Sequence, residues 1–172
     1  MSRILRRAAA VAAAALLPAA VLVPAAHADI AYFSDVGGHI TKVRVSHGPT
    51  TIGVTAYDAE MEFSTRYEFW LDTNPNDPGP EYRVDALPNT EVIPLQKVAN
   101  FDSGGIDTKC SGLRVLADAS DGDDTPYAKI IVPRSCVGTP SKVRVSVVGF
   151  YESPTVTDWA PGERRFYGWV NR

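Results

Sequence analysis

Oxygen-bearing side chains recur within residues 72–81 of this 172-residue chain. Asp72, Asn74, Asp77 and Glu81 all lie in this segment, together with three prolines. Carboxylate and amide oxygens are the ligands that calcium prefers, and a curled loop can bring them together. The segment differs from an EF-hand loop, because Asp77 stands at the glycine position and Arg83 stands where the last glutamate belongs.

Three carboxylates gathered in one loop repel one another unless a positive charge lies between them. Calcium would supply that charge, and so would an arginine from a neighbouring strand, for which Arg66 and Arg83 are the nearest candidates. We expect an arginine to neutralise the loop, so that the protein needs no cofactor. Calcium bound by Asp72, Asn74, Asp77 and Glu81 is the alternative.

Tryptophan side chains offer a second kind of chemistry, the stacking of a sugar ring on a flat aromatic face. Trp70 has the outward parity of Arg66 and Glu68 in an alternating segment, which places it on an exposed strand face. The competing role for a tryptophan is core packing. The ligand-binding residues predicted from the sequence are Trp70, Asp72, Asn74, Asp77, Glu81 and Trp159.

Catalytic motifs are weak in this chain. Residues 102–105, Asp-Ser-Gly-Gly, copy most of the nucleophile motif of chymotrypsin-like proteases, but Phe101 replaces its leading glycine and neither histidine after residue 28 has the sequence context of the base. A surface turn explains the same letters. Glu60 and Glu62 alternate on an extended segment and share one exposed face, so they require no catalytic role. We predict no catalytic residues.

Two cysteines, Cys110 and Cys136, are present, and an even number in an exported chain indicates a disulfide. If strands over 112–117 and 127–132 form a hairpin, the numbers of opposed residues add up to about 246. The two cysteine numbers give the same total. The disulfide is therefore expected to clamp the base of this hairpin.

The first 28 residues have the order of a secretory signal. Three arginines precede an apolar stretch over 8–23, and Ala26-His27-Ala28 matches an A-x-A cleavage site. We expect cleavage after Ala28, with an uncleaved anchor as the alternative, and a single domain over residues 29–172. The protein is then secreted and extracellular.

Alternation of apolar and polar residues predicts the elements that must position these side chains. Glycine and proline clusters separate the alternating segments, and no segment has the apolar period of a helix of three turns. The pattern predicts an all-β, antiparallel β-sandwich of Greek-key or jelly-roll type with about nine strands and one disulfide. The expected strands cover residues 30–33, 40–47, 51–57, 64–71, 82–87, 112–117, 127–132, 142–150 and 166–170.

Composition and charge restrict the classes of partner. The chain is 45% hydrophobic and 22% charged, as in ordinary globular proteins. Residues 29–172 contain 14 basic and 20 acidic residues, a balance that disfavours nucleic acid and anionic membranes unless a basic face is clustered. We expect a monomer that binds an extracellular glycan or protein, and neither nucleic acid nor a membrane after signal removal.

Four strings resemble one pattern: DVGGHITKVRVSH at 35–47, WLDTN with PGPEY within 70–82, VPRSC at 132–136 and WVNR at 169–172. Together they are similar to small secreted proteins of streptomycete-like actinobacteria, a group that supplies no catalytic residues to carry over. A looser likeness is to carbohydrate-binding or DOMON-like β-sandwiches. The resemblance implies a secreted sandwich whose loops and strand faces carry the ligand.

These observations rank three functions. First is a secreted, non-catalytic module that binds an extracellular glycan or cell-wall polymer. The second is a secreted protein-interaction or inhibitor domain, which would use an exposed rigid loop such as 74–80. A small extracellular hydrolase comes third and requires a histidine or carboxylate pair in a cleft.

The disulfide is testable by thiol titration of the exported protein in denaturant. We expect no reactive thiol before a reductant is added and two afterwards, because both cysteines are bonded. Two reactive thiols before reduction would contradict the pairing.

Overall fold

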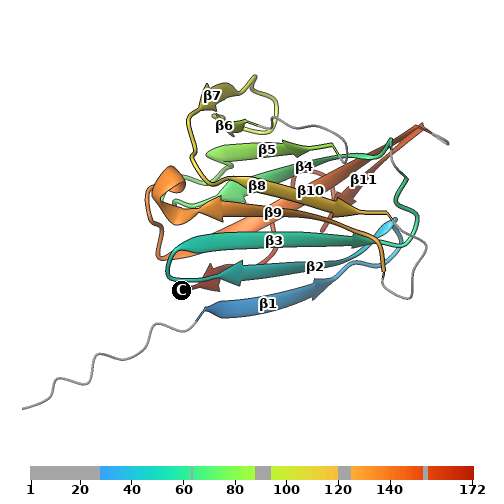
Figure 1. Cartoon of the computed structure of the whole chain (residues 1–172), viewed down its shortest axis with the longest axis horizontal. Coiled ribbons are helices and arrows are strands. Elements are labelled where there is room, and N and C mark those ends of the chain that lie inside the picture. Colours follow the sequence, from blue (N-terminus) through green and yellow to red (C-terminus); the bar gives the residue numbers. More distant parts are fainter. Residues whose placement is uncertain (1–27, 63, 88–93, 120–124, 153–154) are drawn as a thin grey trace, which may run out of the picture.

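The computed structural model describes residues 28–62, 64–87, 94–119, 125–152 and 155–172. Within these ranges the chain forms twelve strands in two antiparallel sheets that pack face to face (Figure 1). The predicted all-β sandwich with one disulfide is confirmed. The predicted signal lies outside the described residues, apart from Ala28.

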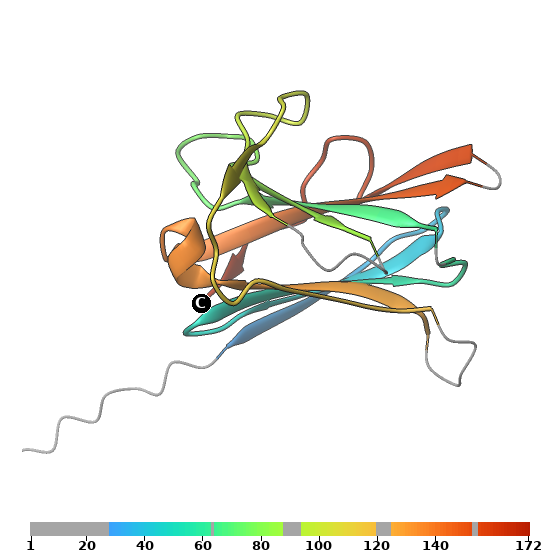
Figure 2. The same cartoon turned by 45° about the horizontal axis from the view of Figure 1, so that its top comes forward.

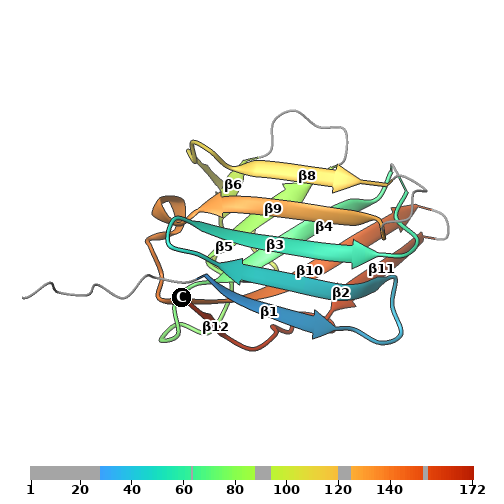
Figure 3. The ribbon, with the colours of Figure 1, turned by 60° about the horizontal axis from the view of Figure 1, so that its bottom comes forward.

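Sheet A contains five strands in the order β1-β2-β3-β9-β8. Figure 3 shows this sheet in front, with the strands of the other sheet crossing obliquely behind it. Its strands are β1 (Asp29–Ser34), β2 (Ile40–His47), β3 (Thr51–Asp58), β8 (Arg114–Asp118) and β9 (Tyr127–Pro133).

Sheet B has the order β11-β10-β4-β5-β6-β7, and β12 pairs with β10. The chain therefore changes sheets after β3, after β7 and, through the short 3-10 helix η1 (Arg134–Val137), after β9. The strands are β4 (Arg66–Asp72), β5 (Tyr82–Ala86), β6 (Leu95–Lys97), β7 (Ile106–Thr108), β10 (Lys142–Glu152), β11 (Thr155–Ala160) and β12 (Val170–Asn171).

The core lies between the two sheets and follows the alternation of the sequence. On β2, Val43 and Val45 are fully buried. On β4, Tyr67, Phe69 and Leu71 are fully buried against them, as the parity of that segment predicts. Burying each large apolar side chain contributes roughly 1.5–3 kcal/mol, so the shared core holds the sheets together.

The strand count differs from the expected nine because short or polar strands carry little alternation. Strands β6 and β7 have three residues each. Strand β11 forms a hairpin with β10 although four of its six residues are polar or small. The strand expected over 166–170 is wrong, since only Val170 and Asn171 pair with β10. Phe166 instead packs on Phe101 outside sheet B.

The hairpin of β8 and β9 forms, but its register is shifted by one residue from the predicted one. Arg114 lies opposite Ile131, and Val115 lies opposite Ile130. The predicted register assumes that Cys110 and Cys136 are opposed in the same way as the strand residues. Cys136 instead lies in η1, beyond the end of β9, where the helical path rises less per residue than a strand. The positions of the cysteines therefore do not report the strand register.

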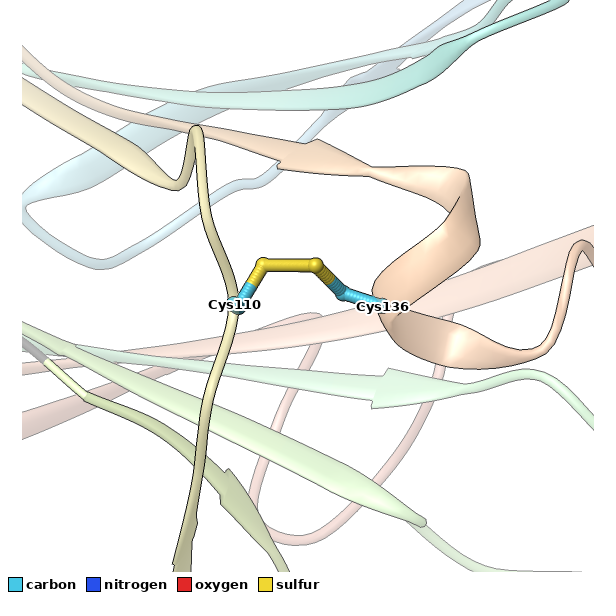
Figure 4. Close-up of a disulfide and its surroundings, with 2 residues drawn as sticks. All are labelled: Cys110 and Cys136. Carbon is cyan, nitrogen blue, oxygen red and sulfur yellow. A yellow bond between two sulfur atoms is a disulfide. The ribbon is translucent and has the colours of Figure 1, made fainter.

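The disulfide joins two segments in which the chain crosses from one sheet to the other. Cys110 lies between β7 of sheet B and β8 of sheet A, and Cys136 lies in η1 between β9 and β10 (Figure 4). Their sulfur atoms are bonded, with Cα atoms 5.5 Å apart. The bond thus ties the base of the hairpin, as predicted, and it also ties sheet A to sheet B at this end.

Arg134 organises the loops at the same end of the sandwich. Its guanidinium is buried and donates to the carbonyl of Pro49 at 2.8 Å and to that of Thr139 at 3.0 Å, and also to the Pro140 carbonyl. Burial lowers the pKa of this side chain below its ordinary value.

Among the described residues, no helix has the length and apolar character needed to cross a membrane.

Candidate ligand-binding surfaces

An aromatic cluster covers part of the outer face of sheet B. Trp70 points away from the core, as its parity predicts, but only 2% of its surface is exposed. The ring of Phe101 covers it, with the two ring centroids 5.1 Å apart. Phe101 also contacts Trp159 at 5.7 Å and Phe166 at 5.2 Å. We call these four residues the aromatic cluster.

The cluster closes because loops 98–105 and 161–169 fold onto sheet B, on the side facing away from sheet A (Figure 2). Arg83 lies 5.1 Å from the ring of Trp70, and Trp159 is half-buried at the edge of Phe101. A sugar ring reaches Trp70 only if Phe101 moves away. The two predicted tryptophans therefore belong to a second small core rather than to an open platform.

Asp72, at the end of β4, forms an ion pair at the root of loop 73–81. Its side chain is fully buried, and its Oδ2 accepts hydrogen bonds from Arg144 Nη2 at 2.6 Å and Arg144 Nε at 2.7 Å. The cross-strand register places Arg144 directly opposite Asp72. An arginine thus neutralises this carboxylate, as expected, but the arginine comes from β10.

The two arginines named from the sequence have other partners, so that part of the prediction is wrong. Arg83 pairs with Asp85 at 3.0 Å and donates to Gln96, while Arg66 pairs with Glu68 at 3.4 Å. Glu68 is mostly buried, and this burial raises the pKa of its carboxyl, to which nearby Asp85 adds.

The remaining oxygens of the loop hold its own backbone. Asp72 Oδ1 accepts from the Asn74 amide at 3.1 Å, and Asn74 Oδ1 accepts from the Asn76 amide at 3.1 Å. Glu81 Oε2 accepts from the Thr73 amide at 2.6 Å, and burial raises the pKa of Glu81. The structure therefore gathers Asp72, Asn74 and Glu81 around one loop.

Asp77 lies exposed at the tip of the loop, where its amide donates to the carbonyl of Asn74 at 3.1 Å. In the described part of the chain, no three or more His, Cys, Asp or Glu side chains are grouped as metal ligands.

Residues 102–105 form the surface turn that explains their likeness to a protease motif. Ser103 Oγ accepts from the amides of Ala99 at 2.9 Å and Asn100 at 3.1 Å, and it donates to the carbonyl of Asn100. Asp102 is bound by Arg164 at 2.6 Å. The hydroxyl of Ser103 is thus engaged in shaping the turn that carries Phe101.

Sequence reasoning missed the outer face of sheet A. Figure 3 shows that no described element crosses in front of this face. A shallow hollow of about 400 Å³ lies on it, and we call its lining the tyrosine face. The tyrosine face consists of Tyr32, Lys42, Arg44, Thr55, Tyr57, Thr125, Tyr127 and Lys129.

Strand register builds this face from two rows that cross the sheet. One row runs Lys42, Tyr57, Tyr127 from β2 through β3 to β9. The second row runs Tyr32, Arg44, Thr55, Lys129 from β1 to β9. Outward parity of each residue was visible in the sequence, but the pairing of β3 with β9, some 70 residues apart, was not.

Comparison of this chain with protein families, curated proteins and solved structures finds no match.

The Asp72–Arg144 pair gives a first prediction for this region. Replacing Arg144 by Gln leaves a buried carboxylate unpaired, and we expect the free energy of unfolding to fall by about 3 kcal/mol in urea titrations. The double variant Asp72→Asn/Arg144→Gln removes the stranded charge and recovers part of the loss. Arg83→Gln is the matched control and has a smaller effect, because the Asp85 carboxylate is partly exposed. Equal losses in both single variants would contradict the assignment.

Calcium gives a second prediction. Because Arg144 and backbone amides already bind the loop oxygens, we expect the same midpoint of thermal unfolding in calcium and in chelator. A rise of several degrees with calcium, absent in Glu81→Gln, would instead show that the loop binds the metal.

Proposed function

We propose that the chain is a secreted, non-catalytic module that binds an extracellular glycan or cell-wall polymer, and that the tyrosine face holds the ligand. The observation that carries this proposal is an open hollow, on an uncovered sheet face, that contains three tyrosines and two threonines. Aromatic rings suit the apolar faces of sugars, and hydroxyl groups exchange hydrogen bonds with sugar hydroxyls. The resemblance to small secreted actinobacterial proteins agrees with an extracellular ligand.

The lining of the hollow favours binding over hydrolysis. Among the described residues that line it, none is a carboxylate or a histidine. Glycoside hydrolysis needs two carboxyl groups on opposite sides of the scissile bond. A shallow, open surface also suits a long polymer, because successive units of the polymer lie across the sheet without having to enter a closed cavity.

A protein-interaction or inhibitor function is the second candidate, and a different region favours it. Loop 73–79 is exposed at its tip while its root at Asp72 is buried and hydrogen-bonded. Close to this root, Glu81, Lys97 and Ser103 line a second hollow of about 370 Å³, beside Ile106, which is 75% exposed. Val98, Ala99 and Ile106 together make this lining partly apolar, and an apolar patch with a polar rim is a common feature of protein contacts.

Pull-down on insoluble peptidoglycan, together with a glycan array, tests the proposed function. We expect Tyr127→Ala to weaken binding about tenfold, because its ring and hydroxyl line the hollow. Trp159→Ala, on the outer side of sheet B, is the matched aromatic control and leaves binding unchanged.

Binding that depends on Trp159 and not on Tyr127 would move the site to the aromatic cluster. If the parent protein binds neither peptidoglycan nor any glycan on the array, the proposal of glycan binding is wrong and the protein-interaction alternative is favoured. Circular dichroism of each variant checks that the sandwich is intact.

A further inference from the structure

The cations of sheet A differ in their partners from the arginines of strands β4, β5 and β10. Arg66, Arg83, Arg144 and Arg164 each pair with a carboxylate. Four cations on the outer face of sheet A have no recorded carboxylate partner among the described residues. These four are Lys42, Arg44, Arg114 and Lys129.

This segregation stands out because acidic residues outnumber basic ones after residue 28. Within the described strands of sheet A, the outward-facing positions contain one carboxylate, Asp118, which lies opposite Tyr127 at the β8 edge. Among the described residues, the charged side chains at the centre of the face are therefore all positive. Such a surface concentrates negative charge from solution.

The tyrosines hold two of these cations in place. Lys42 Nζ lies 4.1 Å from the ring centroid of Tyr57, its partner across the strands. Arg44 Cζ lies 5.9 Å from the ring of Tyr32, again directly across. A cation over an aromatic face is attracted by the ring and loses little hydration at an exposed site. The charges are thus positioned before any ligand arrives.

The same contacts limit what these two rings can do for a neutral sugar. A sugar stacks on a bare ring, whereas the faces of Tyr57 and Tyr32 are turned to the cations of the chain itself. Tyr127 contacts the tilted ring of Tyr57 at 6.5 Å, and no cation of the described residues lies over its ring, so it offers an aromatic face to the ligand. The main groups that the tyrosine face offers to a ligand are therefore its positive charges. One aromatic ring and several hydroxyls are available in addition.

We propose that the tyrosine face binds an acidic polysaccharide, a glycan whose rings carry carboxylate, sulfate or phosphate groups. This inference rests on the proposed function and specifies its ligand. Arg44 and Lys129 share one row and lie two strands apart, about 10 Å at the backbone, and Lys42 lies about 7 Å from Arg44 along β2. Repeated anionic groups of one polymer can contact all three cations at once.

Two other anionic polymers fit less well. Single-stranded nucleic acid binds through rows of bare aromatic faces, and here one face is bare. The acidic composition disfavours nucleic acid unless basic residues cluster on one face, and the outer face of sheet A is such a cluster. Nucleic acid is therefore included in the test. In an acidic polypeptide the groups that bear the charge are Asp and Glu side chains, which have no ring to place on Tyr127.

Titration calorimetry with the exported chain tests this inference with polymers matched in backbone. The pairs are dextran sulfate with dextran, and polygalacturonate with its methyl ester. We expect the charged member of a pair to bind and the neutral member not to bind. Affinity should fall at least about tenfold between about 0.05 M and about 0.3 M salt, because exposed charges are screened.

Variants locate the site. We expect Lys42→Gln/Lys129→Gln to weaken binding about tenfold, since each exposed charge contact contributes modestly and the contacts act together on one polymer. Lys109→Gln/Arg165→Gln changes the net charge equally at exposed positions off this face and leaves affinity unchanged. Equal losses in the two double variants would overturn the assignment to the tyrosine face.

The remaining outcomes separate the two proposals. If neutral and charged polymers bind equally well and Tyr127→Ala weakens both, glycan binding stands and the acidic ligand is overturned. Tighter binding of polyglutamate or oligothymidylate than of any charged polysaccharide would also overturn it, in favour of an acidic polypeptide or nucleic acid. If no polysaccharide binds, on the array or here, both proposals fail.

Discussion

The packing of Phe101 against Trp70, Trp159 and Phe166 joins two loops to the outer face of sheet B. A β-sandwich has two outer faces, and the amino-acid sequence gives each of them polar and aromatic residues. Here the outer face of sheet B carries a second small hydrophobic layer, and its tryptophans Trp70 and Trp159 pack within that layer. The outer face of sheet A is the sheet surface on which tyrosines, threonines and cations remain open to a ligand.

The two outer faces also differ in how their charged side chains are paired. On sheet B, carboxylates and arginines pair with one another, and the pair of Asp72 with Arg144 sits at the root of an exposed loop. Buried carboxylates cost free energy unless such partners are present. Asp58, also fully buried, accepts hydrogen bonds from the hydroxyls of Tyr67 and Tyr151. On sheet A, Lys42 and Arg44 lie over the rings of Tyr57 and Tyr32, and neither has a recorded carboxylate partner among the described residues.

One end of the sandwich is held by a disulfide together with the hydrogen bonds of a buried arginine. The disulfide between Cys110 and Cys136 ties two passages between the sheets, and Arg134 binds carbonyls of Pro49, Thr139 and Pro140. The strands of sheet A that form the tyrosine face begin or end near these loops. Their register, which decides the neighbours of each outward side chain, is therefore stabilised at this end.

Much of the architecture follows from the sequence by itself. Period-two alternation separates inward residues such as Phe69 and Leu71 from outward ones such as Trp70, because successive side chains of a strand point to opposite faces. The same pattern identifies nearly all the longer strands, and the even number of cysteines identifies the disulfide. These features depend on local spacing, which the order of residues contains.

The identity of the open face was decided only in the tertiary structure. Alternation distinguishes the inside of a sheet from its outside, but it does not say which outside a distant loop will cover. It also does not say which strands are neighbours: Arg144 meets Asp72, and Tyr127 meets Tyr57, through pairings between segments about 70 residues apart. Contacts of that kind arise when the two sheets close on one core, so the candidate site was not contained in any local pattern.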